Sequence, residues 1–129
     1  MAQYVALLDH YGLYSVFDNS AVKLDGIQSS SLEPTNSELT SYKQTQQNRS
    51  RISISGFQFS CLVGQKDKTK PSVYQGNNRF ALIHHIPNTS RIMLLVGKQE
   101  TSLDEIQNIM HSLQQQHIFQ PTQETREFQ

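Results

Sequence analysis

The segment from Arg91 to His117 constrains the fold most, because a short apolar run is followed there by an amphipathic pattern. Residues 92–96 read Ile-Met-Leu-Leu-Val, with no polar interruption between Arg91 and Gly97. Such a run is too short for a helix and lacks the alternation of a strand that has one face in water. It predicts a strand that is covered on both faces, at the centre of a sheet.

An amphipathic helix is predicted directly after this strand. Thr101 or Ser102 serves as its N-cap, and acidic residues occupy the first turn, where the helix dipole favours anions. Apolar residues at three- and four-residue spacing form the stripe that packs on the sheet, namely Leu103, Ile106, Met110 and Leu113. We therefore expect a sheet whose last strand leads into a docked helix.

The first half of the chain predicts two more helices and a hairpin. Residues 2–11 place apolar and aromatic side chains on one helical face before Gly12, which predicts an N-terminal helix. Residues 13–27 then predict two strands joined by a turn at 18–20. The pattern Thr35-Asn-Ser-Glu38 is a capping box that opens a short helix ending near residue 44.

The second half predicts further strands. Apolar alternation changes phase at Gly56, which indicates a turn or bulge at residues 55–56 between two extended segments. After a charged loop at 64–71, Val73 and Tyr74 predict a short edge strand, and residues 80–86 predict a longer one. The expected fold is α+β: about six antiparallel strands, both terminal helices on one face, and the short helix on the other.

Composition narrows the class of protein. With 129 residues and 36% hydrophobic content, the chain suits one domain, expected over residues 1–119, with 120–129 as a flexible tail. Eleven basic residues balance eleven acidic ones, so no nucleic-acid partner is expected. The single cysteine, Cys61, excludes a disulfide framework, and no apolar stretch predicts a transmembrane segment or exported leader. A cytoplasmic location follows as the expectation.

The sequence offers no pattern for catalysis or for a cofactor. His84 and His85 are adjacent on a predicted strand and point to opposite faces, so they cannot chelate one metal ion. Cys61 has no base paired with it in the sequence and is expected as a small, half-buried core residue. Glycine-rich phosphate loops and nucleophile elbows are also missing from the sequence. We therefore expect a binding domain and no enzyme.

Three segments carry a resemblance to profilin, the small cytoplasmic protein that binds actin monomers. Ser31-Leu-Glu-Pro-Thr-Asn-Ser-Glu-Leu39 is similar to the start of the short helix in profilins, and Ile52-Ser-Ile-Ser-Gly-Phe-Gln-Phe59 is similar to one of their strands. Ile92-Met-Leu-Leu-Val-Gly-Lys98 resembles their penultimate element, which is also followed by a terminal helix. The resemblance implies a profilin-like domain that acts as a monomer, associates with the cytoskeleton, sequesters actin monomers and regulates actin polymerisation.

The resemblance also implies which residues bind actin. Profilins use their later strands with the start and one flank of the C-terminal helix. On the helix side, the matching residues are Lys98, Thr101, Asp104, Gln107, Asn108 and His111. On the strand side they are Cys61, Val63, Gln65, Arg79 and Phe80. A plain solvated helix face is the alternative explanation for the polar flank.

Two further binding sites of profilins have weaker counterparts here. The chain has no tryptophan, whereas typical profilins use two in a groove for proline-rich peptides, and it lacks a glycine pair after Glu100. In both respects it resembles profilins of Asgard archaea more than those of animals or plants. A remnant polyproline groove would use Tyr4, Leu8, Tyr11, Ser112 and Phe119. Phosphoinositide headgroups would contact Lys66, Lys68 and Lys70, unless that loop is only a soluble hairpin tip.

Two other classes remain open. A longin- or roadblock-type scaffold, which serves small GTPases in membrane traffic, also sandwiches a small antiparallel sheet between helices. Longin domains end in two consecutive helices, whereas this sequence predicts one helix after its most hydrophobic strand. A sensor domain with a small ligand in the sheet concavity would need a glycine-lined pocket with convergent polar groups, for which the sequence shows no pattern.

Overall fold

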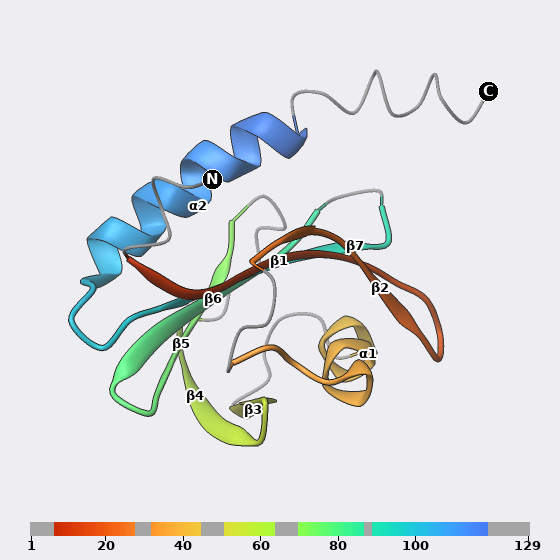
Figure 1. Cartoon of the computed structure of the whole chain (residues 1–129), viewed down its shortest axis with the longest axis horizontal. Helices are drawn as coiled ribbons and strands as arrows, with labels where there is room; N and C mark the ends of the chain where they lie inside the picture. The colour runs from red at the N-terminus through yellow and green to blue at the C-terminus, as the bar shows by residue number, and fades with distance from the viewer. Residues whose placement is uncertain (1–6, 28–31, 45–50, 64–69, 87–88, 119–129) are drawn as a thin grey trace.

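The structure of the chain is a computed structural model that describes residues 7–27, 32–44, 51–63, 70–86 and 89–118 (Figure 1). Within these residues it contains seven strands and two helices. In chain order they are β1 (Leu8–Val16), β2 (Ala21–Gly26), α1 (Asn36–Gln44), β3 (Arg51–Ile54), β4 (Phe57–Val63), β5 (Ser72–Gly76), β6 (Arg79–His85), β7 (Arg91–Gly97) and α2 (Leu103–Ile118). In this part of the chain no helix has the length and hydrophobicity needed to span a membrane.

All strands belong to one antiparallel sheet with the order β2-β1-β7-β6-β5-β4-β3. The apolar strand β7 lies inside the sheet between β1 and β6, and each side chain from Ile92 to Val96 is at most 1% exposed. The prediction of a central strand covered on both faces is confirmed. β5 is not the edge strand that the sequence predicted, because the β3-β4 hairpin extends the sheet beyond it.

The predicted N-terminal helix is wrong at residues 8–11, which belong to β1, and residues 2–6 lie outside the described part of the chain. Tyr11 packs on the α2 side of the sheet, whereas Tyr14 packs on the α1 side. A bulge between Leu8 and His10 places Leu8 on the same side as Tyr11. The three-residue spacing of Leu8 and Tyr11 therefore imitates a helical period within a strand.

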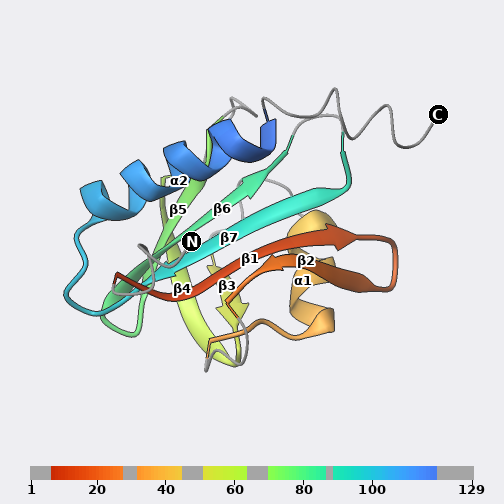
Figure 2. The same ribbon diagram turned by 45° about the horizontal axis from the view of Figure 1, so that its top comes forward.

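Helix α2 covers one face of the sheet (Figures 1 and 2). The α2-side core is formed by Leu8, Tyr11, Leu13, Val73, Leu82, Ile86, Met93, Leu95, Ile106, Ile109, Met110 and Leu113. The predicted stripe is confirmed, with Leu103 partly buried and Ile109 as an additional member. Ser102 is the N-cap: its hydroxyl accepts from the Glu105 N–H at 3.2 Å, and its own N–H donates to Glu105 Oε1 at 3.0 Å.

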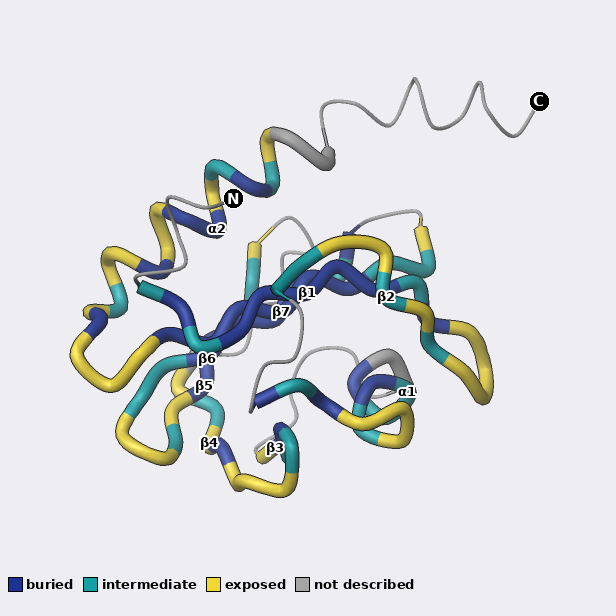
Figure 3. The backbone as a smooth tube through the Cα atoms, in the orientation of Figure 1, coloured by how far each residue is buried: buried dark blue, intermediate teal, exposed yellow. Residues whose placement is uncertain are grey.

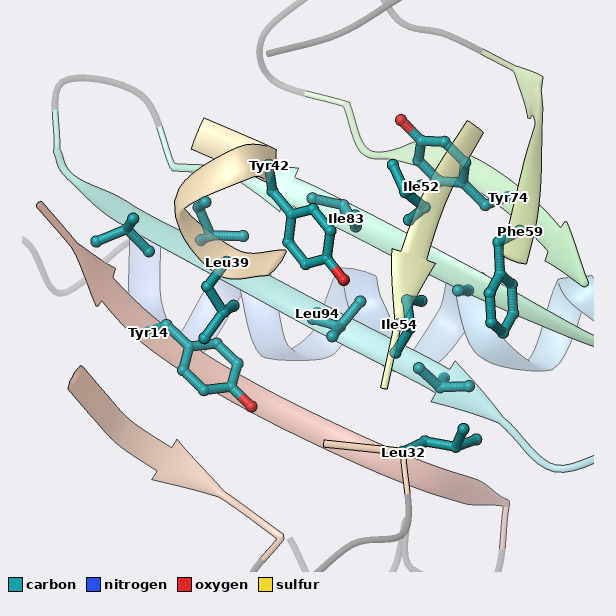
Figure 4. Packing of buried hydrophobic residues seen from close by; sticks show 14 residues of the cluster. Tyr14, Leu32, Leu39, Tyr42, Ile52, Ile54, Phe59, Tyr74, Ile83 and Leu94 are labelled. Carbon is teal, nitrogen blue, oxygen red and sulfur yellow. The ribbon is translucent and has the colours of Figure 1, made fainter. Parts of the chain in front are cut away.

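Helix α1 covers the opposite, concave face, as predicted. The α1-side core is formed by Tyr14, Val16, Leu32, Leu39, Tyr42, Ile52, Ile54, Phe59, Tyr74, Ala81, Ile83, Ile92, Leu94 and Val96 (Figure 4). The predicted capping box is confirmed: the Glu38 N–H donates to Thr35 Oγ1 at 3.1 Å, and the Thr35 N–H donates to Glu38 Oε1 at 2.8 Å. Figure 3 shows the buried strands running between the two helices.

The start of α1 is tied to both outer strands of the sheet. Asn36 Oδ1 accepts from the N–H of Ala21 in β2 at 2.7 Å. On the other side, the Glu38 carboxylate accepts from Ser53 Oγ at 2.6 Å and from the N–H groups of Ser55 and Gly56 at 2.8 and 3.0 Å. These bonds satisfy backbone groups at both ends of the sheet, so polar residues of α1 help to hold its two outer strands.

We expect Glu38→Gln to lower the free energy of unfolding by about 2 kcal/mol, because an amide offers one acceptor where several donors converge. Burial raises the pKa of Glu38, but the hydrogen bonds from Ser53, Thr35, Gly56 and Ser55 outweigh it and hold the pKa below its ordinary value. Urea unfolding at pH 7 measures the loss. Glu100→Gln, at an exposed position, is the matched control, and an equal, small effect of both substitutions would contradict this role for Glu38.

Candidate functional site

A polar surface is formed where α2 meets the part of the sheet that this helix leaves uncovered. The helix contacts β6 and β7, while β4 and β5 continue the sheet beside it (Figure 2). Ser60, Gln75 and Phe80 are register partners across β4, β5 and β6. Arg51 of β3 pairs with Ser60 and extends the row to the edge of the sheet.

Strand alternation explains why this row faces outward. Phe59, Tyr74 and Ala81 belong to the α1-side core, so the residues next to them in each strand point to the opposite face. Ser60 and Gln75 are exposed, and Phe80 is half-buried against the α2-side core. The sheet therefore contributes a row of small polar groups that ends in an aromatic ring beside the helix.

The helix contributes Asp104, Gln107 and His111, which are all exposed. Glu105, on the other flank of α2, lines a pocket with Leu7 and Asp9 near β1. Because residues on opposite flanks of a helix face opposite neighbours, Asp104, Gln107 and His111 lie away from this pocket, on the other flank of α2. We call Arg51, Ser60, Gln75, Phe80, Asp104, Gln107 and His111 together the α2–sheet surface. Its groups are two amides, one hydroxyl, one imidazole and one phenyl ring, with one cation and one carboxylate.

A hydrogen bond within α2 holds one side chain of the helix flank. The side-chain amide of Gln115 donates to His111 Nε2 at 3.0 Å, one turn further along α2. Asn108 is exposed on the outward side of the helix, next to this flank. The predicted helix residues Asp104, Gln107, Asn108 and His111 are thus all accessible to a partner.

Three other predicted residues lie around the turn between β7 and α2. Lys98 is exposed, and its backbone N–H donates to the Leu7 carbonyl at 3.0 Å. Thr101 is 6% exposed, and its hydroxyl donates to the same carbonyl at 2.8 Å. Arg79 forms an ion pair with Asp9 at 3.3 Å. Thr101 therefore fixes the turn, whereas Lys98 and Arg79 lie beside it near Glu105, on the other flank of α2 from Asp104.

Cys61 does not share this surface, because its side chain packs against the α1-side core. The alternation of side chains in β4 explains why the prediction for Cys61 was wrong. Phe59 is fully buried on the concave side, and Cys61, two residues later, points to the same side. Val63 lies in β4 with its side chain outside the described part, and Gln65 is outside it altogether. Ser60 and Gln75 were missed, since only the register shows which residues line up across the strands.

The predicted polyproline and phosphoinositide sites are described only in part. Leu8 and Tyr11 are 2% and 0% exposed, so in this structure neither can line a polyproline groove, and Ser112 is half-buried. Burial raises the pKa of the Tyr11 hydroxyl, which donates to Asp25 Oδ2 at 3.5 Å. Lys70 is exposed at the start of β5. The remaining predicted residues, Tyr4, Phe119, Lys66 and Lys68, lie outside the described residues.

The α2–sheet surface combines a rigid strand row with an accessible helix flank, which suits contact with another macromolecule. Among the residues described, no group of three or more His, Cys, Asp or Glu side chains is arranged to hold a metal ion. His84 and His85 point to opposite faces of β6, where His85 Nε2 contacts the Tyr42 carbonyl of α1 at 3.0 Å.

Comparisons with protein-family models, with curated proteins and with solved structures each find no match for this chain.

Proposed function

We propose that this chain is a profilin-like domain that binds monomeric actin, or an actin homologue, through the α2–sheet surface and thereby regulates actin polymerisation. The observations that carry the proposal are the row Ser60-Gln75-Phe80 on the α2 side of the sheet and the exposed flank of α2 with Asp104, Gln107 and His111. The actin face implied by the sequence resemblance combines the later strands with this flank. An α+β sheet with one helix on each face is compatible with the same resemblance.

The physical properties of the surface suit a monomer-binding role. The strands are held by the backbone ladder and by cores on both sides, so they would lose little conformational entropy on binding. A standard interface of about 800 Å² per partner would fit a domain of this size. Phe80, half-buried at the end of the row, is the aromatic anchor, and Gln75, Gln107 and His111 set the register around it. A monomer covered in this way is withheld from spontaneous nucleation.

Polymerisation of pyrene-labelled actin tests the proposal directly. We expect saturating protein to lengthen the nucleation lag and to lower the filament yield, and we expect pull-down with immobilised monomeric actin to recover the chain. An unchanged lag together with no recovery would refute the proposal. Recovery of a small GTPase in a parallel pull-down, without actin, would instead favour the longin- or roadblock-type alternative.

The double substitution Asp104→Lys with Gln107→Arg should weaken actin binding by roughly tenfold or more, because it places two bulky cations where a carboxylate and an amide would contact the partner. Asp18→Lys with Asn19→Arg makes the same kind of charge change at the exposed β1-β2 turn. Sedimentation or fluorescence titration measures both affinities, and circular dichroism checks that both variants are folded. Equal affinities of the two double variants would exclude the helix flank from the interface.

A further inference from the structure

The turn between β7 and α2 forms one wall of an open pocket of about 550 Å³. Its lining comes from the residues before and at the start of β1, from the start of β6, and from the first turn of α2: Leu7, Asp9, Arg79, Lys98, Gln99, Glu100, Thr101 and Glu105. This volume lies in the range of small-molecule sites in proteins. The pocket uses a different flank of α2 from the α2–sheet surface.

The pocket walls are held in place before any ligand arrives. The Leu7 carbonyl accepts from both the Lys98 N–H and the Thr101 hydroxyl, so the turn is bound to the chain that leads into β1. Gly97 packs directly on α2: a Cβ added there would lie 2.3 Å from Ile106 Cδ1. A ligand would therefore meet a preformed site and would not have to order the turn.

Arg79 has hydrogen-bonding capacity that its protein contacts do not use. Its side chain is 14% exposed, and its Nη1 contacts Asp9 Oδ2 at 3.3 Å. Its Nε is buried and has no hydrogen-bond partner among the residues that the structure describes. Arg79 also lines the pocket, and an anionic oxygen is the acceptor that a guanidinium binds best. Arg79 therefore favours a carboxylate or a similar group in the pocket.

The remaining charges in the lining have both signs. Lys98 is exposed and supplies a second cation, whereas Glu100 and Glu105 supply carboxylates at the same turn. Glu105 uses Oε1 to accept from Ser102, which keeps this carboxylate in place at the start of α2. A simple anion would be repelled by the glutamates, and a simple cation by Arg79 and Lys98. The lining is complementary to a ligand that carries both charges.

We propose that this pocket binds a small zwitterion of the amino-acid or short-peptide class. The ligand carboxylate would lie toward Arg79 and Lys98, and its ammonium group toward Glu100 and Glu105. Each charged end of the ligand would then meet groups of the opposite charge in the lining. The proposal involves no actin and stands apart from the proposed function.

The test is titration of the full chain with the dipeptide alanyl-alanine, with free alanine, with acetate and with methylammonium, followed by amide NMR shifts. We expect saturable amide shifts in residues 98–105 with at least one of the two zwitterions, the dipeptide or the amino acid. Acetate and methylammonium, which each carry only one charge, should bind more weakly than that zwitterion by roughly tenfold or more. Failure of both zwitterions to shift this turn, or equal binding of acetate or of methylammonium, would overturn the proposal.

Substitutions test separately how the pocket recognises the carboxylate and the ammonium end of the ligand. Lys98→Gln and Glu100→Gln, both at exposed positions, should each weaken zwitterion binding by roughly tenfold while leaving the fold intact. Arg79→Lys keeps the positive charge but removes the planar guanidinium that suits a carboxylate, and it should weaken the carboxylate end in the same way. Arg51→Gln, at the distant edge strand β3, is the control and should bind like the unaltered chain. Unaltered binding by all three pocket variants would overturn the assignment.

Discussion

Acidification from pH 6.5 to pH 4.5 should lower the free energy of unfolding by several kcal/mol, because two imidazole rings are held neutral inside the protein. His10 and His84 are both 0% exposed. Burial is the main cause that lowers the pKa of each ring from 6.5 to about 4. A shift of that size corresponds to about 3 kcal/mol for each group. Since whole domains are stable by roughly 5–15 kcal/mol, these two groups would decide acid tolerance.

The sign follows from proton binding in the two states. Between pH 6.5 and about 4, the unfolded chain protonates these histidines and the folded protein does not, so stability is full above pH 6.5 and is lost as the pH falls toward 4. His85 adds to this loss, because burial lowers its pKa more than the bond to Tyr42 raises it. Glu38 has an ordinary pKa of 4.5, and its pKa is lower in the folded protein. Its contribution to stability is therefore lost below pH 4.5, so it does not affect the histidine effect between pH 6.5 and pH 4.5.

Urea unfolding at half-unit intervals between pH 7 and pH 4.5 measures the effect. His84→Leu should remove a large part of the slope, and among the described residues neither ring nitrogen of His84 is hydrogen-bonded to another side chain that the leucine would leave unpaired. His10→Leu also disrupts a hydrogen bond of 2.7 Å between His10 Nε2 and the Tyr14 hydroxyl, so it costs stability at every pH as well. A flat profile for the unaltered protein over this range would contradict the neutral buried histidines.

Gly26→Ala should lower the free energy of unfolding by about 3 kcal/mol, because both conformation and space exclude a side chain there. Gly26 has φ 135°, which L residues rarely adopt, and lies opposite Gly12 at the end of the β1-β2 ladder. An added Cβ would lie 2.2 Å from the Tyr11 carbonyl oxygen and 2.9 Å from the Gly12 Cα. These are backbone atoms of a strand packed between two cores, so they cannot move aside easily.

Gly56→Ala is the matched control for this prediction. Gly56 also has a positive φ, 87°, but apart from its chain neighbours no heavy atom of the described residues lies within 4 Å of an added Cβ. It belongs to the β3-β4 turn with Ser55, whose φ is 51°. We expect this control to lose only about 1 kcal/mol from conformational strain. Thermal or urea unfolding compares the variants, and equal losses would mean that the contact with Tyr11 does not matter.

Local patterns in the sequence predicted most elements correctly. Capping boxes at Thr35 and Ser102 mark helix starts because their hydrogen bonds involve residues only three positions apart. The apolar run before Gly97 identified a strand that needs cover on both faces. The phase change at Gly56 identified a hairpin turn. Each of these signals is contained in one short segment, so a single sequence is enough to find it.

The errors arose where distant segments meet. Leu8 and Tyr11 share a face because a bulge in the pairing of β1 with β7 shifts the alternation, and that pairing joins residues far apart in the chain. Likewise, only the register of β4, β5 and β6 shows that Ser60, Gln75 and Phe80 form one row and that Cys61 points to the other side. Strand pairing is non-local, so hydrophobic periodicity does not show which strands pair or in which register.

The sequence by itself thus determined the α+β class, the two described helices with their caps, and the central place of residues 92–96. Tertiary structure alone decided that the chain from Leu8 is a strand, that β5 lies inside the sheet, and that the turn at Lys98 encloses a pocket with Arg79 and Asp9. The physical reason is range: caps and periods act between neighbours in the chain, whereas registers, sheet edges and pockets are set by contacts between segments that only folding brings together.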